Sequence, residues 1–423
     1  MRALLCTGYG GGNVPPLVAI TSELVSRGHT LRVLTGPFAV KSPRFESMEE
    51  SFRSVGCEVL WRDPAVWLDG VPATGTDDHP IPDHLLTVRG AALWHPLSVP
   101  WAVQTRDEIS DFRPDVVVVD FCMPGAAIAA EEALIPYVIL STTVPGHRLF
   151  QGWPVPGRGA ARHEDEVSRQ DEFLRLYGDT TLPWLNAARA RLELSIDEGP
   201  WQWDDRAAKH LLLTSPAFDF DGEALPPNYV YTGSLRPSAS DKPWESPWAI
   251  DDARALVVVS STSTFLSFQW MPVFQAAIEA IADSRIRGLV TLTQYVDPAT
   301  LPSAENVVMR DYVPHEAVLP LASAIISQCG HGTTMAALRH GVPMVCVPVF
   351  GDQPDVAARV VHHGAGIRLS TTSTTAEFRD AIRAVVGEPR YREAARRLAE
   401  VMSAEDGASR AADEIEAVAA APS

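Results

Sequence analysis

The sequence predicts an α/β fold with two domains, each built on a doubly wound parallel sheet. A chain of 423 residues exceeds the usual size of one domain and suits two. Continuous apolar runs, such as residues 115–120 and 324–326, are typical of strands buried on both faces of a parallel sheet. These runs alternate with helical segments, as parallel connections require. We expect an N-terminal domain over residues 1–217, a linker over 218–252, a C-terminal domain over 253–402 and a last helix within 403–423.

The N-terminal half opens as a strand, a glycine-rich loop, a helix and a second strand. Further strands are predicted at residues 57–61, 115–120, 137–142 and 209–215, the last of this domain. Helices are predicted at 15–27, 125–134 and within 155–190. A dinucleotide-binding loop is not favoured, because Asn13 stands where its third glycine belongs and the second strand ends without an acidic residue.

The linker is marked by prolines and a loss of periodicity. It contains Asp219-Phe220-Asp221, a D-x-D triplet of the kind that binds metal ions elsewhere. We discount it, because three residues recur by chance and no metal site is predicted around them. The second domain has predicted strands at residues 255–259, 288–293, 306–309, 324–326 and 343–347, and helices at 333–340 and within 377–421.

Composition excludes several classes of function. A net charge of −18 argues against nucleic acid and anionic membranes, which attract basic surfaces. The five cysteines are scattered without metal-type spacing and indicate buried thiols in a reducing compartment. No apolar run reaches membrane-spanning length and no leader segment is recognised, so a cytoplasmic protein is expected; a homodimer is left open.

The stretch from residue 311 to 369 carries the chemistry. An apolar strand ends in glycines and hydroxyls that open a helix, whose free N–H groups and partial positive charge suit a phosphate. The next strand brings Asp352 and Gln353 to the same carboxyl edge, where ligands of open sheets bind. A phosphate cradle beside a hydroxyl-reading acid and amide describes a nucleotide-sugar site.

Four motifs in this stretch resemble the donor-binding box of the inverting glycosyltransferases that act on small molecules. They occur in order at residues 312–315, 327–334, 341–343 and 348–353. The resemblance implies the GT-B fold, in which two Rossmann-like domains face each other across a cleft and the last helix packs back on the first domain. It implies a metal-independent hexosyl transfer from a TDP- or UDP-sugar to an apolar natural-product acceptor, as in antibiotic tailoring, without a cofactor.

The same resemblance implies the donor-site residues. Hydroxyls after the strand at 255–259 and the glycine helix start would face the phosphates, and the acid–amide pair would read sugar hydroxyls. Gln328 replaces the family's common phosphate-facing histidine. The expected donor residues are Gly12, Ser263, Thr264, Tyr312, Val313, His315, Gln328, Gly330, His331, Gly332, Thr333, Thr334, Asp352 and Gln353.

The catalytic base of the family maps onto Asn13. An amide accepts no proton at neutral pH and can only orient a substrate. Asp120, which in plant members would orient the missing histidine, becomes the alternative base, although it also suits the cap of the following helix. Thr142 ends a strand at the same edge and is expected to contact the acceptor.

The non-periodic region from Trp67 to Pro100 is expected to line the acceptor site, with His79, His84 and Trp94 as candidates. The two histidines are candidate replacement bases, although loop histidines more often have no such role. Three alternatives stay open: an acceptor acidic or carbon-nucleophilic enough to need little base, an epimerase or hydrolase on the same fold, and an auxiliary protein that partners a true transferase.

Overall fold

The structure is a computed structural model of the chain. It describes residues 1–9, 12–37, 45–62, 95–144, 164–220, 225–235, 244–249, 251–261, 270–293, 296–311, 313–349 and 351–421.

The N-terminal domain is a parallel sheet whose described strands follow the order β3-β2-β1-β4-β5-β6-β7. Residues such as Val116 to Val119 are fully or almost fully buried, as the apolar runs predicted. The strands are β1 (Arg2–Tyr9), β2 (Thr30–Pro37), β3 (Glu58–Trp61), β4 (Val116–Asp120), β5 (Tyr137–Ser141), β6 (Lys209–Leu212) and β7 (Tyr229–Tyr231).

Helices cover both faces of this sheet. One face packs against α1, α2 and the last helix, α14, and the other against α4 to α7. The described elements are α1 (Val14–Ser26), α2 (Phe45–Ser54), α4 (Ser98–Phe112), α5 (Pro124–Glu132), α6 (Glu164–Arg191), α7 (Gln202–Asp205), and the short 3-10 helices η3 (His95–Leu97) and η5 (Pro216–Phe218).

The C-terminal domain repeats this plan with the strand order β10-β9-β8-β11-β12-β13, again all parallel. Its strands are β8 (Leu256–Ser260), β9 (Arg287–Thr291), β10 (Val307–Arg310), β11 (Ala324–Ser327), β12 (Met344–Cys346) and β13 (Gly366–Arg368). Its helices are α8 (Met271–Ala282), α9 (His315–Val318), α10 (His331–Arg339), α11 (Gln353–His362), α12 (Thr375–Gly387), α13 (Pro389–Ser403), η7 (Pro298–Thr300) and η8 (Leu319–Leu321). The predicted two-domain α/β fold is confirmed.

Two short strands correct the sequence analysis. Residues 209–215 are not the last strand of the first sheet, because β7 pairs with β6 beyond them. β7 lies inside the predicted linker, where Pro226 and Pro227 obscured it. β13, which pairs with β12, was also missed. The residue boundaries of the domains stay a prediction.

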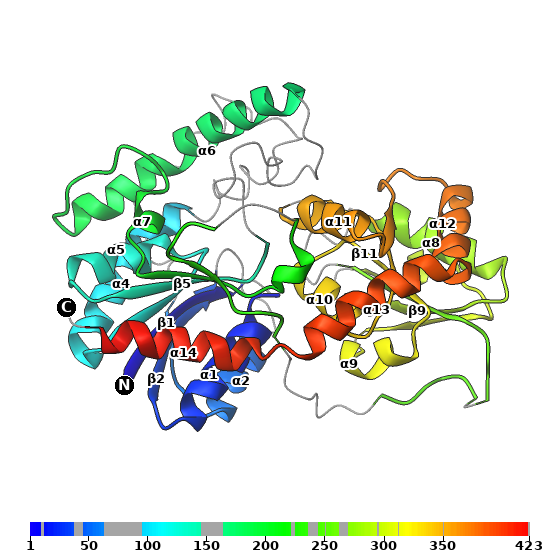
Figure 1. The fold of residues 1–423 in the computed structure, drawn as a ribbon, viewed down its shortest axis with the longest axis horizontal. Helices are drawn as coiled ribbons and strands as arrows, with labels where there is room; N and C mark the ends of the chain where they lie inside the picture. The colour runs from blue at the N-terminus through cyan, green and yellow to red at the C-terminus, as the bar shows by residue number, and fades with distance from the viewer. Residues whose placement is uncertain are drawn as a thin grey trace.

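The chain crosses twice between the domains. After α13 on the C-terminal domain, α14 (Gly407–Ala420) returns to the N-terminal domain and lies along α1 (Figure 1). Its Ala411, Ala412 and Ile415 are fully buried in the core that β1 and α1 also form. Arg27 bonds Asp413 and Glu416, and His29 bonds Glu416 at 2.6 Å. The Arg27-Gly28-His29 turn therefore docks the last helix.

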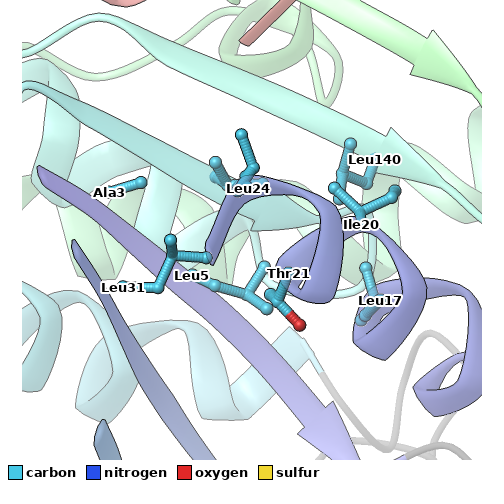
Figure 2. Close-up of a pocket in the computed structure, with 9 residues that line it drawn as sticks. Ala3, Leu5, Leu17, Ile20, Thr21, Leu24, Leu31 and Leu140 are labelled. Atoms are coloured by element: carbon cyan, nitrogen blue, oxygen red, sulfur yellow. The ribbon is translucent and has the colours of Figure 1, made fainter. Parts of the chain in front are cut away.

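A small cavity lies between α1 and the first sheet (Figure 2). Its volume is about 10 Å³, and its walls are Leu5, Leu17, Leu24 and similar side chains. Thr21 supplies a hydroxyl, which donates to the carbonyl of Val18 within its own helix. A space of this size and lining is a packing void of the core and not a ligand site.

Candidate active site

Both sheets bring polar residues to the edge where ligands of such sheets bind. The chain reverses its direction of sheet growth between β1 and β4, and again between β8 and β11. Asp120 ends β4, Ser260 ends β8 and Ser327 ends β11. Ligands of open α/β sheets bind at the carboxyl ends of strands beside such switch points. The two edges thus define the place of the candidate site.

Asp120 is the buried centre of the N-terminal edge. Its side chain is 0% exposed. One carboxylate oxygen accepts a hydrogen bond from the Thr7 hydroxyl at 2.9 Å, and the other accepts from the backbone N–H of Cys122 at 3.2 Å. Burial raises the pKa of Asp120 to about 6, against the effect of these hydrogen bonds. The carboxyl group therefore titrates close to neutral pH.

Asn13 connects Asp120 to the end of β5. It precedes α1, whose first turn is set by Pro15 and Pro16. Its amide N–H lies 3.3 and 3.4 Å from the two oxygens of Asp120, and its amide oxygen accepts from the Thr142 hydroxyl at 2.9 Å. The structure thus brings together three residues that the sequence singled out, and Asn13 is the more exposed part of this network.

The start of α10 forms the phosphate-type cradle of the C-terminal edge. Gly330 precedes the helix, and a Cβ at this position would lie 3.1 Å from the amide nitrogen of Gln328. Gly332 faces open space and Thr333 is half-buried beside it. Cys329 adopts a φ of 64°, which turns the chain from β11 into the helix. The free N–H groups of this turn and the Gln328 amide suit an anion.

Two neighbouring side chains of α10 lie deeper. His331 is 7% exposed and Thr334 is 0% exposed. Burial lowers the pKa of His331 to about 3, so its imidazole is neutral at physiological pH. His331 therefore adds no positive charge to the predicted phosphate cradle.

Asp352 and Gln353 stand at the start of α11, as the sequence predicted. The Gln353 side chain is buried, and its amide oxygen accepts from the backbone N–H of Val349 at 3.0 Å, which fixes the loop before the helix. Asp352 accepts a hydrogen bond from the Thr143 hydroxyl of the N-terminal domain at 2.5 Å. Burial raises the pKa of Asp352, and the Thr143 bond opposes this.

The remaining expected residues are placed as follows. His315 opens α9 and lies 3.2 Å from the Ser260 hydroxyl, which joins the ends of β8 and α9. Burial lowers the pKa of His315. Val313 is buried in the core and Gly12 is exposed beside Asn13. Ser263, Thr264, Tyr312, His79, His84 and Trp94 lie outside the described residues.

Thr143 is the main residue that sequence reasoning missed. Its hydroxyl bonds Asp352 across 209 positions of sequence. The run Ser141-Thr142-Thr143 at a strand end was the available signal, but only Thr142 was assigned. Thr7 and the backbone of Cys122, which hold Asp120, were missed as well.

The D-x-D triplet has a structural role at its first residue. Asp219 is buried in an ion pair with Arg359, while Asp221 lies outside the described residues. Within the described part of the chain, no three His, Cys, Asp or Glu side chains gather as a metal site would require. Nor does a helix in that part have the length and apolar character needed to cross a membrane.

Solved structures share this architecture over nearly the whole chain. The glycosyltransferase of kitacinnamycin superposes with a TM-score of 0.77 at 22% identity, covering 99% of this chain and 98% of that one. CalG4, the calicheamicin glycosyltransferase, superposes with a TM-score of 0.71 at 23% identity, covering 100% and 99%. These likenesses show that the chain has the GT-B fold.

Sequence comparisons indicate which proteins of this fold the chain is similar to. Residues 280–418 match the protein family described as "Erythromycin biosynthesis protein CIII-like, C-terminal domain". The chain is 29% identical to 4'-demethylrebeccamycin synthase of Lentzea aerocolonigenes over 98% of this chain and 99% of that protein. It is 27% identical to demethyllactenocin mycarosyltransferase of Streptomyces fradiae over 96% and 84%. The chain is a nucleotide-sugar glycosyltransferase with the GT-B fold, and it is similar to enzymes that tailor natural products in bacteria.

Proposed function

We propose that this enzyme transfers a hexose from a TDP- or UDP-sugar to an apolar natural-product acceptor, with inversion at the anomeric carbon and without a metal ion. The observation that carries the proposal is the hydrogen bond between Thr143 and Asp352. Thr143 directly follows Thr142 of the Asn13 network, so the predicted acceptor-side and sugar-side residues meet at one point between the domains.

The donor half of the proposal assigns the diphosphate to the start of α10. The N–H groups of this turn, the Gln328 amide and the Thr333 hydroxyl would stabilise the charge that develops on the leaving diphosphate. Asp352 and Gln353 would bind sugar hydroxyls. A thymidine donor is the first to test, since the structures of two similar proteins, VinC and a spinosyn rhamnosyltransferase, contain TDP.

The acceptor half assigns proton removal to Asp120 and orientation to Asn13. The acceptor nucleophile would give its proton to the Asp120 carboxylate while its lone pair attacks the anomeric carbon from the face opposite the diphosphate. The bond from that carbon to the diphosphate oxygen breaks, and the configuration inverts. The bonds from Asn13 to Asp120 are long, at 3.3 and 3.4 Å, so a substrate hydroxyl that displaces the amide can make a better one.

Complete burial of Asp120 favours a second version of the chemistry. An acceptor that is acidic, such as a phenol, or an activated aromatic carbon ionises or reacts with little help from a base. In that version Asn13 positions the acceptor and Asp120 only holds Asn13. The two versions differ in how strongly a replacement of Asp120 should lower the rate.

The test uses the purified full chain with TDP-glucose or UDP-glucose and a panel of aromatic aglycones in EDTA. Product formation is followed by liquid chromatography, and the configuration of the new bond by NMR coupling constants. We expect turnover that EDTA leaves unchanged, with a β-glycoside formed from the α-linked donor. Protein that neither binds nor turns over any TDP- or UDP-sugar contradicts the proposed function, and a retained α-configuration contradicts the inverting mechanism.

A further inference from the structure

Helix α11 carries two groups of polar residues in different surroundings. Its start carries Gln353 and is preceded by Asp352, which bonds Thr143 of the N-terminal domain. Two turns later the helix carries Arg359, whose side chain is 1% exposed. The Arg359 guanidinium donates from Nε to Asp219 Oδ1 at 2.9 Å and to the carbonyl of Asp355 at 3.1 Å. A buried arginine is thus bonded both to its own helix and to the segment that connects β6 to β7 in the first sheet.

Asp219 is itself held from the other side. Its second carboxylate oxygen accepts a hydrogen bond from the Tyr231 hydroxyl on β7, an edge strand of the first sheet. The Phe220 ring lies 4.5 Å below the Arg359 guanidinium, and His363 just after α11 donates to the carbonyl of Phe218 at 3.0 Å. The helix that begins with the sugar-side pair is therefore fastened to the first domain through β7 and the connection between β6 and β7.

The apolar packing of α11 is supplemented by these polar bonds. The side chains it buries near Arg359 are small, namely Val356, Ala357 and Val360. Small apolar side chains interlock weakly, whereas the planar fork of an arginine on a carboxylate has a fixed direction and distance. From Arg359 to Asp352 the helix rises about 10 Å, so a shift or rotation at the arginine is transmitted to the start of the helix.

A contribution to stability alone explains the ion pair poorly. Removing two charges from water costs free energy that their attraction only offsets, so apolar residues of similar volume often stabilise a core as well. An ion pair does, however, fix the direction and the distance between its two groups. The charge of Arg359 also reaches the sugar-side acid, because burial raises the pKa of Asp352 and Arg359 acts against that rise.

We propose that Arg359, held by Asp219 and Tyr231, is a positioning residue that sets where α11 presents Asp352 and Gln353 to the donor sugar. It makes recognition of the sugar, but not of the diphosphate, depend on the β6–β7 segment of the N-terminal domain. The inference rests on the proposed function, since it concerns the donor site named there.

The experiment compares the affinities of TDP and TDP-glucose by isothermal titration calorimetry in the full chain. The variants are Arg359→Lys, Asp219→Asn and Tyr231→Phe, and the ratio of the two dissociation constants reports the sugar alone. Arg189→Lys is the matched control, because Arg189 is 2% exposed and pairs with Glu131 at 2.7 Å in the N-terminal domain, away from α11. Thermal unfolding of each variant establishes that it is folded.

We expect Arg359→Lys and Asp219→Asn to lose about fivefold or more in affinity for TDP-glucose relative to TDP, as the loss of one or two sugar hydrogen bonds would cause. Affinity for TDP should change less than about twofold. Tyr231→Phe removes one hydroxyl and should shift the ratio in the same direction, which decides the matter if the other two variants do not fold. The control should leave the ratio unchanged.

An unchanged ratio in the folded variants overturns the inference, as does an equal loss in the Arg189→Lys control. A wild-type protein that binds neither ligand has a different meaning. It overturns the proposed function itself, and the inference with it.

Discussion

At the residue scale, the acceptor side of the proposed site centres on one buried carboxyl group, that of Asp120. Burial raises the pKa of Asp120 to about 6, and Thr7, Asn13 and the Cys122 backbone hold it in place. A carboxylate with a pKa just below the working pH combines sufficient ionisation with improved basicity. The Asn13 amide cannot accept a proton at neutral pH, so replacements of Asp120 and of Asn13 should affect the reaction differently.

Replacing Asp120 by Asn should remove the base and keep the shape of the site. For the wild type we expect kcat/KM to rise with pH through about 6, because only the deprotonated carboxylate accepts a proton. Asp120→Asn should lose about 100-fold or more and show no such rise, whereas Asn13→Ala should lose about tenfold and keep it. Initial rates between pH 5 and pH 9 measure both effects. A rise through the same pH in Asp120→Asn would favour the version in which the acceptor needs no base.

A second buried cluster joins the end of β5 to β6, β7 and α7. The Ser141 hydroxyl bonds His210 Nε2 at 2.7 Å, His210 Nδ1 bonds Asp204 at 2.7 Å, and Tyr229 donates to Asp204 at 2.8 Å. The order of groups is that of a hydrolase triad. Since Ser141, His210 and Asp204 are each under 10% exposed, we interpret the cluster as a structural link between β5, β6, β7 and α7.

Replacing His210 by Phe should therefore destabilise the protein without touching the predicted site residues. The ring volume is similar, but Ser141 and Asp204 each lose a buried hydrogen-bond partner. We expect a loss of about 3 kcal/mol in the free energy of unfolding, measured by urea denaturation. His362→Phe is the control, because His362 is exposed and should change stability by less than about 0.5 kcal/mol. Equal stability of both variants would contradict the structural role.

At the element scale, α14 belongs to the N-terminal core although it follows the whole C-terminal domain in sequence. Its Ile415 is fully buried against that core, and Arg27 and His29 fix its polar face. The short connection to α13 restricts where α14 can pack. Burial of the apolar stripe of α14 then stabilises the helix in this position.

Shortening Ile415 should weaken the N-terminal domain. Ile415→Ala leaves a cavity beneath α14 and should lower the free energy of unfolding by about 2–5 kcal/mol. Val401→Ala on α13 is the control, since Val401 is 49% exposed and its truncation removes little buried surface. Chemical denaturation of both variants measures the difference. Equal effects would mean that α14 contributes little to the core.

The helices and strands differ in how clearly the sequence predicts them. The run Val116 to Asp120 is continuous, apolar and followed by a helix, and it was predicted within one residue. β7 and β13 have three residues each, too few to show a period, and were missed. The same limit applies to the site. Asp352 and Gln353 stand in a local motif, so the sequence singles them out as candidates. The contact of Thr143 with Asp352 and that of Arg359 with Asp219 depend on tertiary structure, which no sequence spacing reveals.

At the scale of the whole molecule, the protein carries a large negative charge and so does the nucleotide sugar that it has to bind. The net charge is −18, and a nucleotide sugar brings two negative phosphates. In the proposed donor site, the start of α10 would attract phosphate only within a short range, while the summed charge of the protein would repel it at longer distance. The long-range part is screened by salt at physiological ionic strength.

Association of TDP-glucose should therefore become faster as salt is added. Between about 20 and 200 mM NaCl we expect the association rate constant to rise about two- to fivefold, since the Debye length shortens over this range. Stopped-flow tryptophan fluorescence measures the rate, and uncharged thymidine serves as the control that salt should not affect. A rate that falls with salt would show that positive potential around α10 dominates the approach.

The packing of α14 on the N-terminal domain also determines the order in which the two domains are completed during synthesis. The ribosome makes residues 407–420 after every strand of the second sheet, yet these residues complete the core of the first. While the C-terminal domain emerges and folds, the surface of α1 that awaits α14 is uncovered, a period in which a nascent chain is open to chaperones. The domain that starts the chain is thus the last to be finished, and a polypeptide truncated before residue 407 would carry an exposed apolar groove in place of its final helix.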